Sequence, residues 1–192
     1  MKTPITFMPK WRCRYLRIAA LLPLLAAALF FMPCRTNAAS KEYQVKAVFL
    51  YNFAQFVRWP SSAFPDANAQ LTIGILGDDP FGGILESVTQ SESIRGRKLA
   101  IKRAQSVGAL KGCQIIFIGK SENSRLGEIL GALRGQGVLT VGESAAFCAQ
   151  GGMLNFIIEE GSVHVEIYLD AVKREGLGIN SNLIKSFKIY RP

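Results

Sequence analysis

The sequence predicts a single α/β domain, a layer sandwich whose mixed, mostly parallel sheet is flanked by helices and carries an antiparallel C-terminal hairpin. Three observations predict it. Strand-like and helix-like segments alternate between residues 71 and 141, the run from 113 to 118 is apolar except for Gln114, and two strand-like runs near the end flank a short turn. Alternation of this kind is typical of parallel sheets covered by helices, and the final pair of runs adds antiparallel pairing.

Composition supports a folded domain and argues against nucleic-acid binding. The chain has 192 residues, of which 49% are hydrophobic and 19% charged, so it can bury a core. Its net charge is +9, but six of its 23 basic residues precede residue 36, where no acid occurs. The remaining 17 bases face 14 acids, a net charge of only +3. We therefore expect no nucleic-acid partner.

Residues 1–39 are predicted to be a secretory signal peptide, and residues 40–192 the folded domain. A basic segment ends at Arg17 and is followed by fifteen uncharged residues, Ile18 to Met32, which Pro23 interrupts. That run is shorter than the roughly 20 residues of a membrane-spanning helix. We expect cleavage after Ala38 or Ala39 and a periplasmic location, the alternative being a retained N-terminal anchor.

The first element of the domain is predicted to be a helix from Glu42 to Val57, ended by Trp59-Pro60. Its apolar residues recur at steps of three and four, and further aromatic residues widen the apolar face beyond what one packed face needs. This surplus suggests either core packing or a binding surface. The candidate partner- or ligand-binding residues are Phe49, Phe53, Phe56 and Trp59.

The middle of the chain is predicted to alternate between strands and helices. Asp79 before Pro80 is a typical start of a helix, because aspartate caps free N–H groups and proline fits the first turn. The expected elements are strands at 71–76, 99–102, 113–118 and 138–141, helices at 80–89 and 121–133, and a turn or short helix at 106–110.

The last third of the chain is predicted to form a hairpin followed by helical segments. The runs Met153 to Ile158 and Val163 to Leu169 flank the turn residues 159–162, as in antiparallel hairpins. A short helical segment is expected at 170–175 and a final helix at 181–188.

Cys113 and Cys148 are the two cysteines that remain if the leader is removed. An oxidising compartment permits a bridge between them, which would close a loop of about 35 residues and contribute about 3–4 kcal/mol. Two buried free thiols fit the surrounding apolar residues equally well. Both alternatives remain open at the level of sequence.

No catalytic or metal-binding constellation stands out. Asp78-Asp79 lacks the acceptor aspartate that a phospho-receiver domain requires, and capping by Asp79 explains it better. Ser144 lies in Gly142-Glu143-Ser144-Ala145-Ala146, which has alanine where a nucleophile elbow needs its final glycine. A triad of Ser144 with His164 and Asp170 can be written, but a histidine on an alternating strand usually faces solvent. We therefore expect no enzyme, cofactor or metal site.

Several segments together resemble the YfiR family of periplasmic regulators. The resemblance covers residues 41–190 and is carried by Lys46 to Phe53 with Phe56 and Trp59-Pro60, Gly77 to Gly82, Cys113 to Ile118, Ile167 to Leu169, and Gly176 to Ser181 with Leu183. It implies a small α/β protein, often a homodimer, that binds the periplasmic sensor domain of an inner-membrane diguanylate cyclase and holds the enzyme inactive. An outer-membrane lipoprotein would sequester it. While the repressor holds the cyclase inactive, cyclic-di-GMP synthesis and biofilm formation would fall.

Two functional hypotheses therefore stand side by side. The first is a repressor of a diguanylate cyclase or kinase in the inner membrane. The second is a periplasmic sensor that binds a small apolar ligand beneath the first helix and acts on another membrane receptor.

Overall fold

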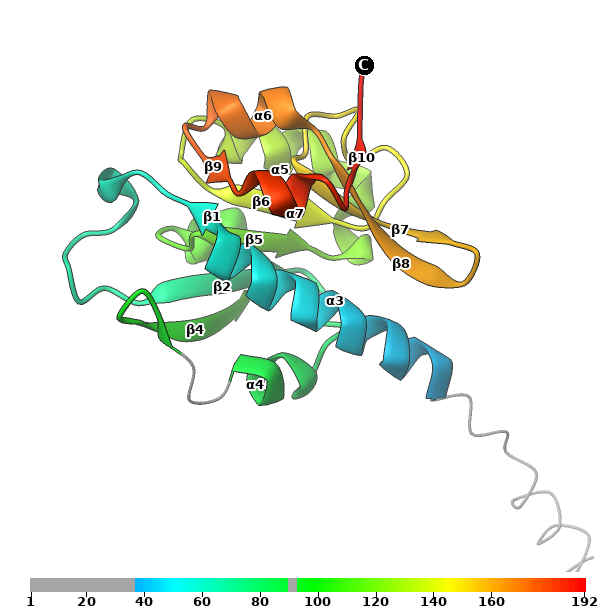
Figure 1. Cartoon of the computed structure of the whole chain (residues 1–192), viewed down its shortest axis with the longest axis horizontal. Coiled ribbons are helices and arrows are strands. Elements are labelled where there is room, and N and C mark those ends of the chain that lie inside the picture. Colours follow the sequence, from blue (N-terminus) through cyan, green and yellow to red (C-terminus); the bar gives the residue numbers. More distant parts are fainter. Residues whose placement is uncertain (1–36, 90–92) are drawn as a thin grey trace, which may run out of the picture. The chain divides into compact units, whose positions relative to one another are not determined.

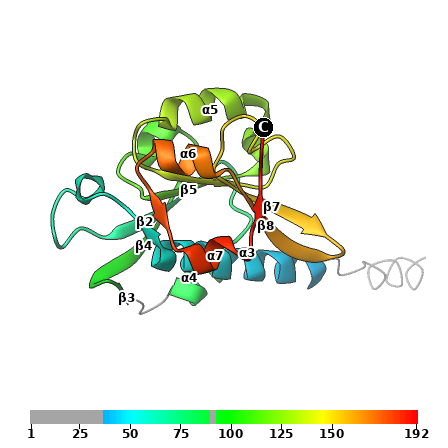
Figure 2. The same ribbon diagram turned by 45° about the horizontal axis from the view of Figure 1, so that its top comes forward.

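The computed structural model describes residues 37–89 and 93–192, so all but the last three residues of the expected leader lie outside the described part of the chain. Its centre is an eight-stranded sheet in the order β10-β8-β7-β6-β5-β2-β4-β3. Figure 1 shows helix α3 running across one face of this sheet, and Figure 2 shows α5 on the opposite face. The predicted α/β layer architecture is confirmed.

The middle of the sheet is parallel, as predicted. Strand β2 (Leu71–Leu76) pairs with β4 (Arg97–Ala104) on one side and with β5 (Ile115–Ile118) on the other. Strand β6 (Leu139–Gly142) pairs next to β5, with Leu139 beside Ile115. All four residues of β5 are buried. A strand covered on both faces needs apolar residues at every position, which explains its unbroken apolar run.

Antiparallel pairing is confined to the sides of the sheet. Strand β7 (Leu154–Glu159) lies parallel to β6 and forms the predicted hairpin with β8 (Ser162–Ile167). At one edge β10 (Lys188–Ile189) runs parallel to β8, and at the other β3 (Ser93–Ile94) pairs antiparallel with β4. These short edge strands were not predicted.

The helices divide the core between the two faces of the sheet. Helix α3 (Asn37–Phe56) buries Leu50, Phe53 and Ala54 in the larger cluster, together with Ile73 and Phe117 of the sheet. Helix α5 (Leu126–Leu133) buries Leu126, Ile129, Leu130 and Leu133 in a second cluster with Leu76, Ile116 and Ile118. Neighbouring residues of β5 thus serve opposite faces, as strand geometry requires.

The remaining elements are short. Three helices follow or precede the strands: α4 (Ile84–Thr89), α6 (Leu169–Arg174) and α7 (Ser181–Ile184). Three 3₁₀ turns cover Ser61–Ala63, Val107–Leu110 and Lys120–Arg125. A separate two-stranded ribbon joins β1 (Val57–Arg58) to β9 (Gly178–Ile179), which links the end of α3 to the segment before α7.

The helix predicted from Pro80 is wrong at its start, since α4 begins only at Ile84. Gly82 has a φ of +52°, a left-handed conformation that a right-handed helix cannot contain. Asp79 does not cap the helix. Its Oδ1 accepts a hydrogen bond from the Phe81 N–H at 2.8 Å, which closes a local turn before the helix.

Three other boundaries differ from prediction. The helix predicted at 121–133 is divided into a 3₁₀ turn and α5, and the predicted strand 113–118 starts at Ile115. The last helix stops at Ile184 instead of 188. Phe187 is buried edge-to-face against Phe53, and Lys188 and Ile189 pair with β8, so tertiary packing ends the helix there.

Candidate interaction surface

The four aromatic residues predicted as binding candidates occupy different environments. Phe53 is fully buried and stacks on Phe156 with ring centroids 6.0 Å apart. Phe49 is partly buried and lies 6.0 Å from the same ring. Both side chains therefore pack in the core, which was the alternative explanation for the surplus of aromatic residues.

Trp59 and Phe56 lie at the end of α3 and differ in what they contact. Trp59 is partly buried, and its indole N–H donates to the Gln114 carbonyl at 3.1 Å, which fixes the chain after α3 to the start of β5. Phe56 is 39% exposed. Of the four candidates, only Phe56 presents a large part of its ring to solvent.

A cavity of about 270 Å³ lies beside Phe56. Its other lining residues come from α7 and its flanks: Asn180, Asn182, Leu183 and Ser186. The Asn180 N–H donates to the Phe56 carbonyl at 3.3 Å, and the Asn180 side chain caps α7 by accepting from the Asn182 N–H at 2.9 Å. The cavity is thus held between the first and last helices of the domain.

Five large apolar side chains are exposed in the described part of the chain: Val45, Val48 and Phe56 of α3, Ile158 of β7 and Ile189 of β10. We call these five the α3–hairpin surface. The N-terminal half of α3 lies beside the β7–β8 hairpin in both Figure 1 and Figure 2. Phe49 turns toward Phe156 of β7, and Val45 shares its side of the helix because residues four apart are neighbours. Val45 and Ile158 thus lie on neighbouring elements, whereas Phe56 lies near the other end of α3, beside α7.

A buried ion cluster beneath α3 was missed by sequence analysis. Lys46 is only 1% exposed, and its Nζ contacts a Glu42 carboxylate oxygen and lies 2.5 Å from Glu143 Oε2. The Tyr43 hydroxyl donates to Glu143 Oε1 at 3.1 Å. Burial, followed by the neighbouring Glu143 charge, raises the pKa of Tyr43 well above its usual range. The cluster fixes α3 to the carboxyl end of β6.

The cluster lacked a clear sequence signal. Lys46 lies four and seven residues before Leu50 and Phe53, which places it on the apolar face of the helix, but its partner Glu143 is 97 residues away along the chain. The useful clue was Glu143 directly after an apolar strand, at the sheet edge where α/β folds place their functional groups.

The usual ligand crevice of such a fold is filled by the protein itself. Chain order reverses between β2 and β5, which is where α/β sheets commonly bind ligands. Here Gly119, after β5, approaches the Asp78 carbonyl so closely that a side chain on it would lie 2.8 Å from that oxygen. The Asp78 N–H donates to Ser121 Oγ at 2.9 Å. These loops leave the crevice closed.

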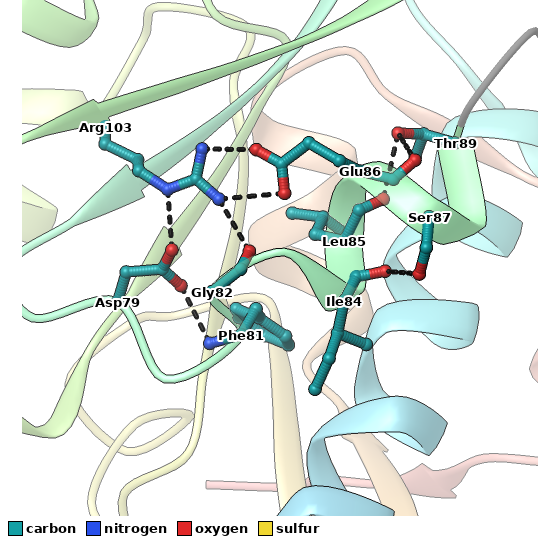
Figure 3. Close-up of polar contacts among 9 residues, drawn as sticks. All are labelled: Asp79, Phe81, Gly82, Ile84, Leu85, Glu86, Ser87, Thr89 and Arg103. Carbon is teal, nitrogen blue, oxygen red and sulfur yellow. Dashed lines mark hydrogen bonds and ion pairs between the residues drawn. The ribbon is translucent and has the colours of Figure 1, made fainter.

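Arg103 holds the loop after β2 and helix α4 together, as Figure 3 shows. Its Nε lies 2.6 Å from Asp79 Oδ2, its Nη1 2.5 Å from Glu86 Oε1, and its Nη2 2.9 Å from the Gly82 carbonyl. The hydrogen bond from Arg103 lowers the pKa of Glu86. Asp79 thus belongs to a structural ion pair.

The three residues that could be written as a triad, Ser144, His164 and Asp170, are not joined by hydrogen bonds. Ser144 Oγ is buried and has no hydrogen-bond partner among the described residues. His164 is exposed on β8 opposite Ile157, and Asp170 lies in the first turn of α6. Within residues 37–89 and 93–192, no group of three or more histidine, cysteine, aspartate or glutamate side chains is arranged to hold a metal ion.

Cys113 and Cys148 are both buried free thiols in the structure, which is the second of the two predicted alternatives. Burial raises the pKa of each thiol, and the pKa of Cys148 is raised further by Glu166. Cys113 packs in the α5 cluster, next to Leu110 and Gly74. Cys148 is not part of that cluster, and whether the two thiols form a bridge in the exported protein stays a prediction.

A larger hollow of about 750 Å³ lies at the amino ends of β5 and β6. Its lining includes Ala63, Lys111, Gln114 and Val138. The Gln114 side chain is already occupied, accepting from the Thr72 N–H at 2.8 Å and donating to the Ala63 carbonyl at 2.8 Å. The Gln114 side chain is therefore already committed to the backbone around the hollow.

A family model described as YfiR/HmsC-like matches residues 43–186, from Tyr43 in α3 to just after α7. The chain belongs to the YfiR/HmsC-like family. The resemblance found in the sequence is confirmed, and the YfiR/HmsC-like family is one of periplasmic regulatory proteins. No curated protein matches the chain closely enough to be compared.

Two solved structures are similar to this YfiR/HmsC-like domain. The "ABC domain in complex with L-Trp" from Streptococcus pneumonia has a TM-score of 0.52 and 9% identity, with 78% of this chain and 60% of that chain covered. A conserved domain protein from Vibrio cholerae has a TM-score of 0.45 and 10% identity, with 62% and 54% covered. The chain thus spans little more than half of each. The first likeness supports the α/β fold alone.

No helix in the described part of the chain has the length and apolar character needed to cross a membrane.

Proposed function

We propose that this protein is an exported regulator that binds the periplasmic sensor domain of an inner-membrane diguanylate cyclase and holds that enzyme inactive. Family membership supports the regulatory role. The observation that carries the binding role is the α3–hairpin surface, which leaves Val45, Val48 and Phe56 exposed on a helix otherwise fixed in the core. A rigid domain of this kind acts on a two-state sensor by binding one state more tightly than the other.

A substitution in this surface tests the proposal. Phe56→Asp places a charge where the contact needs an apolar ring, and we expect it to abolish co-purification with the cyclase and to raise cellular cyclic-di-GMP. Asn123→Asp is the matched control, because it adds the same charge at an exposed position just before α5, away from α3. Equal binding by both variants, with both folded, would exclude this surface as the contact.

Export is part of the proposal. Residues 1–39 would be removed as the leader, with the mature chain starting at Ala39 or Ser40. N-terminal sequencing of the protein recovered from the periplasm tests this directly. The homodimer and the sequestering outer-membrane lipoprotein belong to the same proposal, and light scattering of the purified protein tests the first.

The cavity beside Phe56 favours a second candidate function, a periplasmic sensor of a small apolar ligand. Its volume of about 270 Å³ and its mixture of Phe56, Leu183 and two asparagines suit a small molecule with one polar group. Native mass spectrometry of the purified protein tests it. A bound small molecule lost in Leu183→Trp, which fills the cavity, would support this function over the first.

A further inference from the structure

One edge of the sheet is only partly covered. On the outer side of β8, strand β10 pairs with Glu166 and Ile167 alone. The preceding residues of β8, Ser162 to Val165, have no strand beside them on that side among the described residues. A strand left open in this way presents rows of backbone donors and acceptors that fit another extended chain.

The direction of the open backbone groups follows from the pairing of β10. The Ile167 carbonyl accepts from the Tyr190 N–H at 2.8 Å, so Ile167 presents its backbone groups outward. Successive residues of a strand alternate, and those at even spacing point the same way. The N–H and C=O of Val163 therefore point to the open side, whereas those of His164 point to β7.

The opposite edge of the sheet is protected. Strand β3 pairs only with Arg97 and Lys98 of β4, but the rest of β4 carries Lys102 and Arg103. Charged side chains on an edge are a usual means of preventing further strand pairing. Arg103 is also tied to α4, as described above. Beside the open stretch of β8, the charged groups are Lys188 and Glu159, which pair with each other on the face of the hairpin that carries Ser162 and Glu166. The backbone groups of Val163 remain without a strand partner on the outer side among the described residues.

Apolar side chains lie next to the open stretch. Val163 is partly buried and stands opposite Ile158, which is 51% exposed. Directly opposed residues share one face of a sheet, and this is the face on which Phe156 and Val165 meet α3. The other face of β8 carries Ser162, His164 and Glu166, which are polar. An added strand would therefore meet an apolar face and a polar face.

We propose that β8 binds its protein partner by strand addition, pairing residues 162–165 with an extended segment of the sensor domain. This rests on the proposed function and adds the mode of recognition. The segment carries apolar side chains at alternate positions, on the side of Ile158 and α3, and polar side chains between them. Four residues span only about 13 Å. The α3–hairpin surface therefore supplies the remaining contact.

Amide hydrogen exchange tests the proposal on the unaltered protein. The probes are the separately purified periplasmic domains of the diguanylate cyclases encoded in the same genome. In the domain that binds, we expect the Val163 amide to exchange at least about tenfold more slowly in the complex, because it gains a hydrogen bond. The His164 amide, already directed to β7, is the internal control and should change little.

A backbone substitution gives the second measurement. Val163→Pro removes the outward N–H without removing a bond to β7, which is the position where an edge strand tolerates proline. We expect binding to weaken by about tenfold or more. His164→Ala is the matched control on the same strand. Melting curves establish that both variants fold.

Each outcome decides between the proposals. Failure of every cyclase domain to bind the wild-type protein overturns the proposed function and this inference together. Binding with unchanged Val163 exchange, or equally strong binding by a folded Val163→Pro, overturns strand addition alone. Slowed exchange in a complex that contains only copies of this chain also overturns it, because β8 would then join two copies.

Discussion

At the scale of single residues, the buried Lys46 determines how α3 is held. The side chains of Lys46 and Glu143 are both almost fully buried, so each charge needs a close partner. The other ion-pair partners are Glu42 for Lys46 and Lys120, 3.8 Å away, for Glu143, and both are more exposed. Removing one partner of such a pair commonly costs about 3–5 kcal/mol, because the other charge is left buried without a counterion.

We therefore predict that Lys46→Met lowers the free energy of unfolding by about 3–5 kcal/mol in urea denaturation. Adding Glu143→Gln to it should recover part of the loss, since the orphaned charge is removed. Lys41→Met, at an exposed position of the same helix, should have little effect. Similar losses in Lys41→Met and Lys46→Met would contradict the role of the ion cluster.

The raised pKa of Tyr43 predicts that the stability of the protein falls at alkaline pH. Its pKa is raised in the folded protein by burial and by Glu143, so the folded state keeps its proton longer than the unfolded state does. The stability that Tyr43 contributes is therefore fully present below the ordinary tyrosine pKa of about 10, and it is lost as the pH rises above that value.

Thermal melts between about pH 9 and pH 11 check the sign of this effect. The wild-type protein should lose melting temperature over this range faster than Tyr43→Phe, which has no proton to lose. Parallel curves for the two proteins would show that Tyr43 does not contribute.

The thiols of Cys113 and Cys148 should be unreactive in the native protein. Burial raises the pKa of both, which lowers the fraction present as the nucleophilic thiolate. We expect slow labelling by Ellman's reagent in the native state and rapid labelling of both thiols in guanidinium. Absence of labelling in the denatured, unreduced protein would instead reveal a bridge.

At the scale of elements, the loop after β6 is fixed by one aromatic ring between two glycines. A side chain on Gly142 or on Gly152 would lie 2.2 Å from ring atoms of Phe147, which is itself buried. The loop can close against the sheet only because these two positions lack a Cβ.

Gly142→Ala should therefore destabilise the protein by about 1–3 kcal/mol, the usual cost of overpacking a core. Gly131→Ala is the matched control, because its position in α5 has open space around it. Alanine there should raise stability by about 0.5–1 kcal/mol through its better helix propensity. Urea denaturation of both variants measures the contrast, and a neutral Gly142→Ala would contradict the packing argument.

Helix α4 is held by Leu85, which is buried in the core, and by the contacts of Arg103. Arg103→Ala removes the ion pairs with Asp79 and Glu86 and the hydrogen bond to the Gly82 carbonyl. Because these groups are partly exposed, we expect a global loss of only about 1 kcal/mol. Amide exchange in residues 84–89 should nevertheless become faster, whereas Lys102→Ala should leave it unchanged.

At the scale of the whole molecule, the sequence predicted the layer architecture and most central elements. Strand β2 matches its predicted range, and the hairpin of β7 and β8 is confirmed. These elements depend on local apolar periodicity, which a sequence contains. The edge strands β3 and β10 depend on distant partners, and each has only two residues, too few to show a period.

The candidate surface was predicted only in part, for a related reason. Helical spacing shows that Phe49, Phe53 and Phe56 lie on a wide apolar face, but it does not show how much of that face the sheet covers. Phe156 and Phe187 cover Phe53, and they come from the last part of the chain. Ile158 and Ile189 were not predicted, because their exposure depends on how much of the hairpin and of β10 the rest of the folded chain covers.

The contacts of α3 also constrain the order in which its tertiary contacts can form during folding. Phe53 packs against Phe187, and Val57 pairs with Ile179, so the first helix finds its neighbours near the opposite terminus. A chain that leaves a translocation channel from its amino end can pack this helix on the sheet before its last residues have emerged, but the contacts with Phe187 and Ile179 form only afterwards. The final residues therefore close the end of the first helix, which no earlier part of the chain can do.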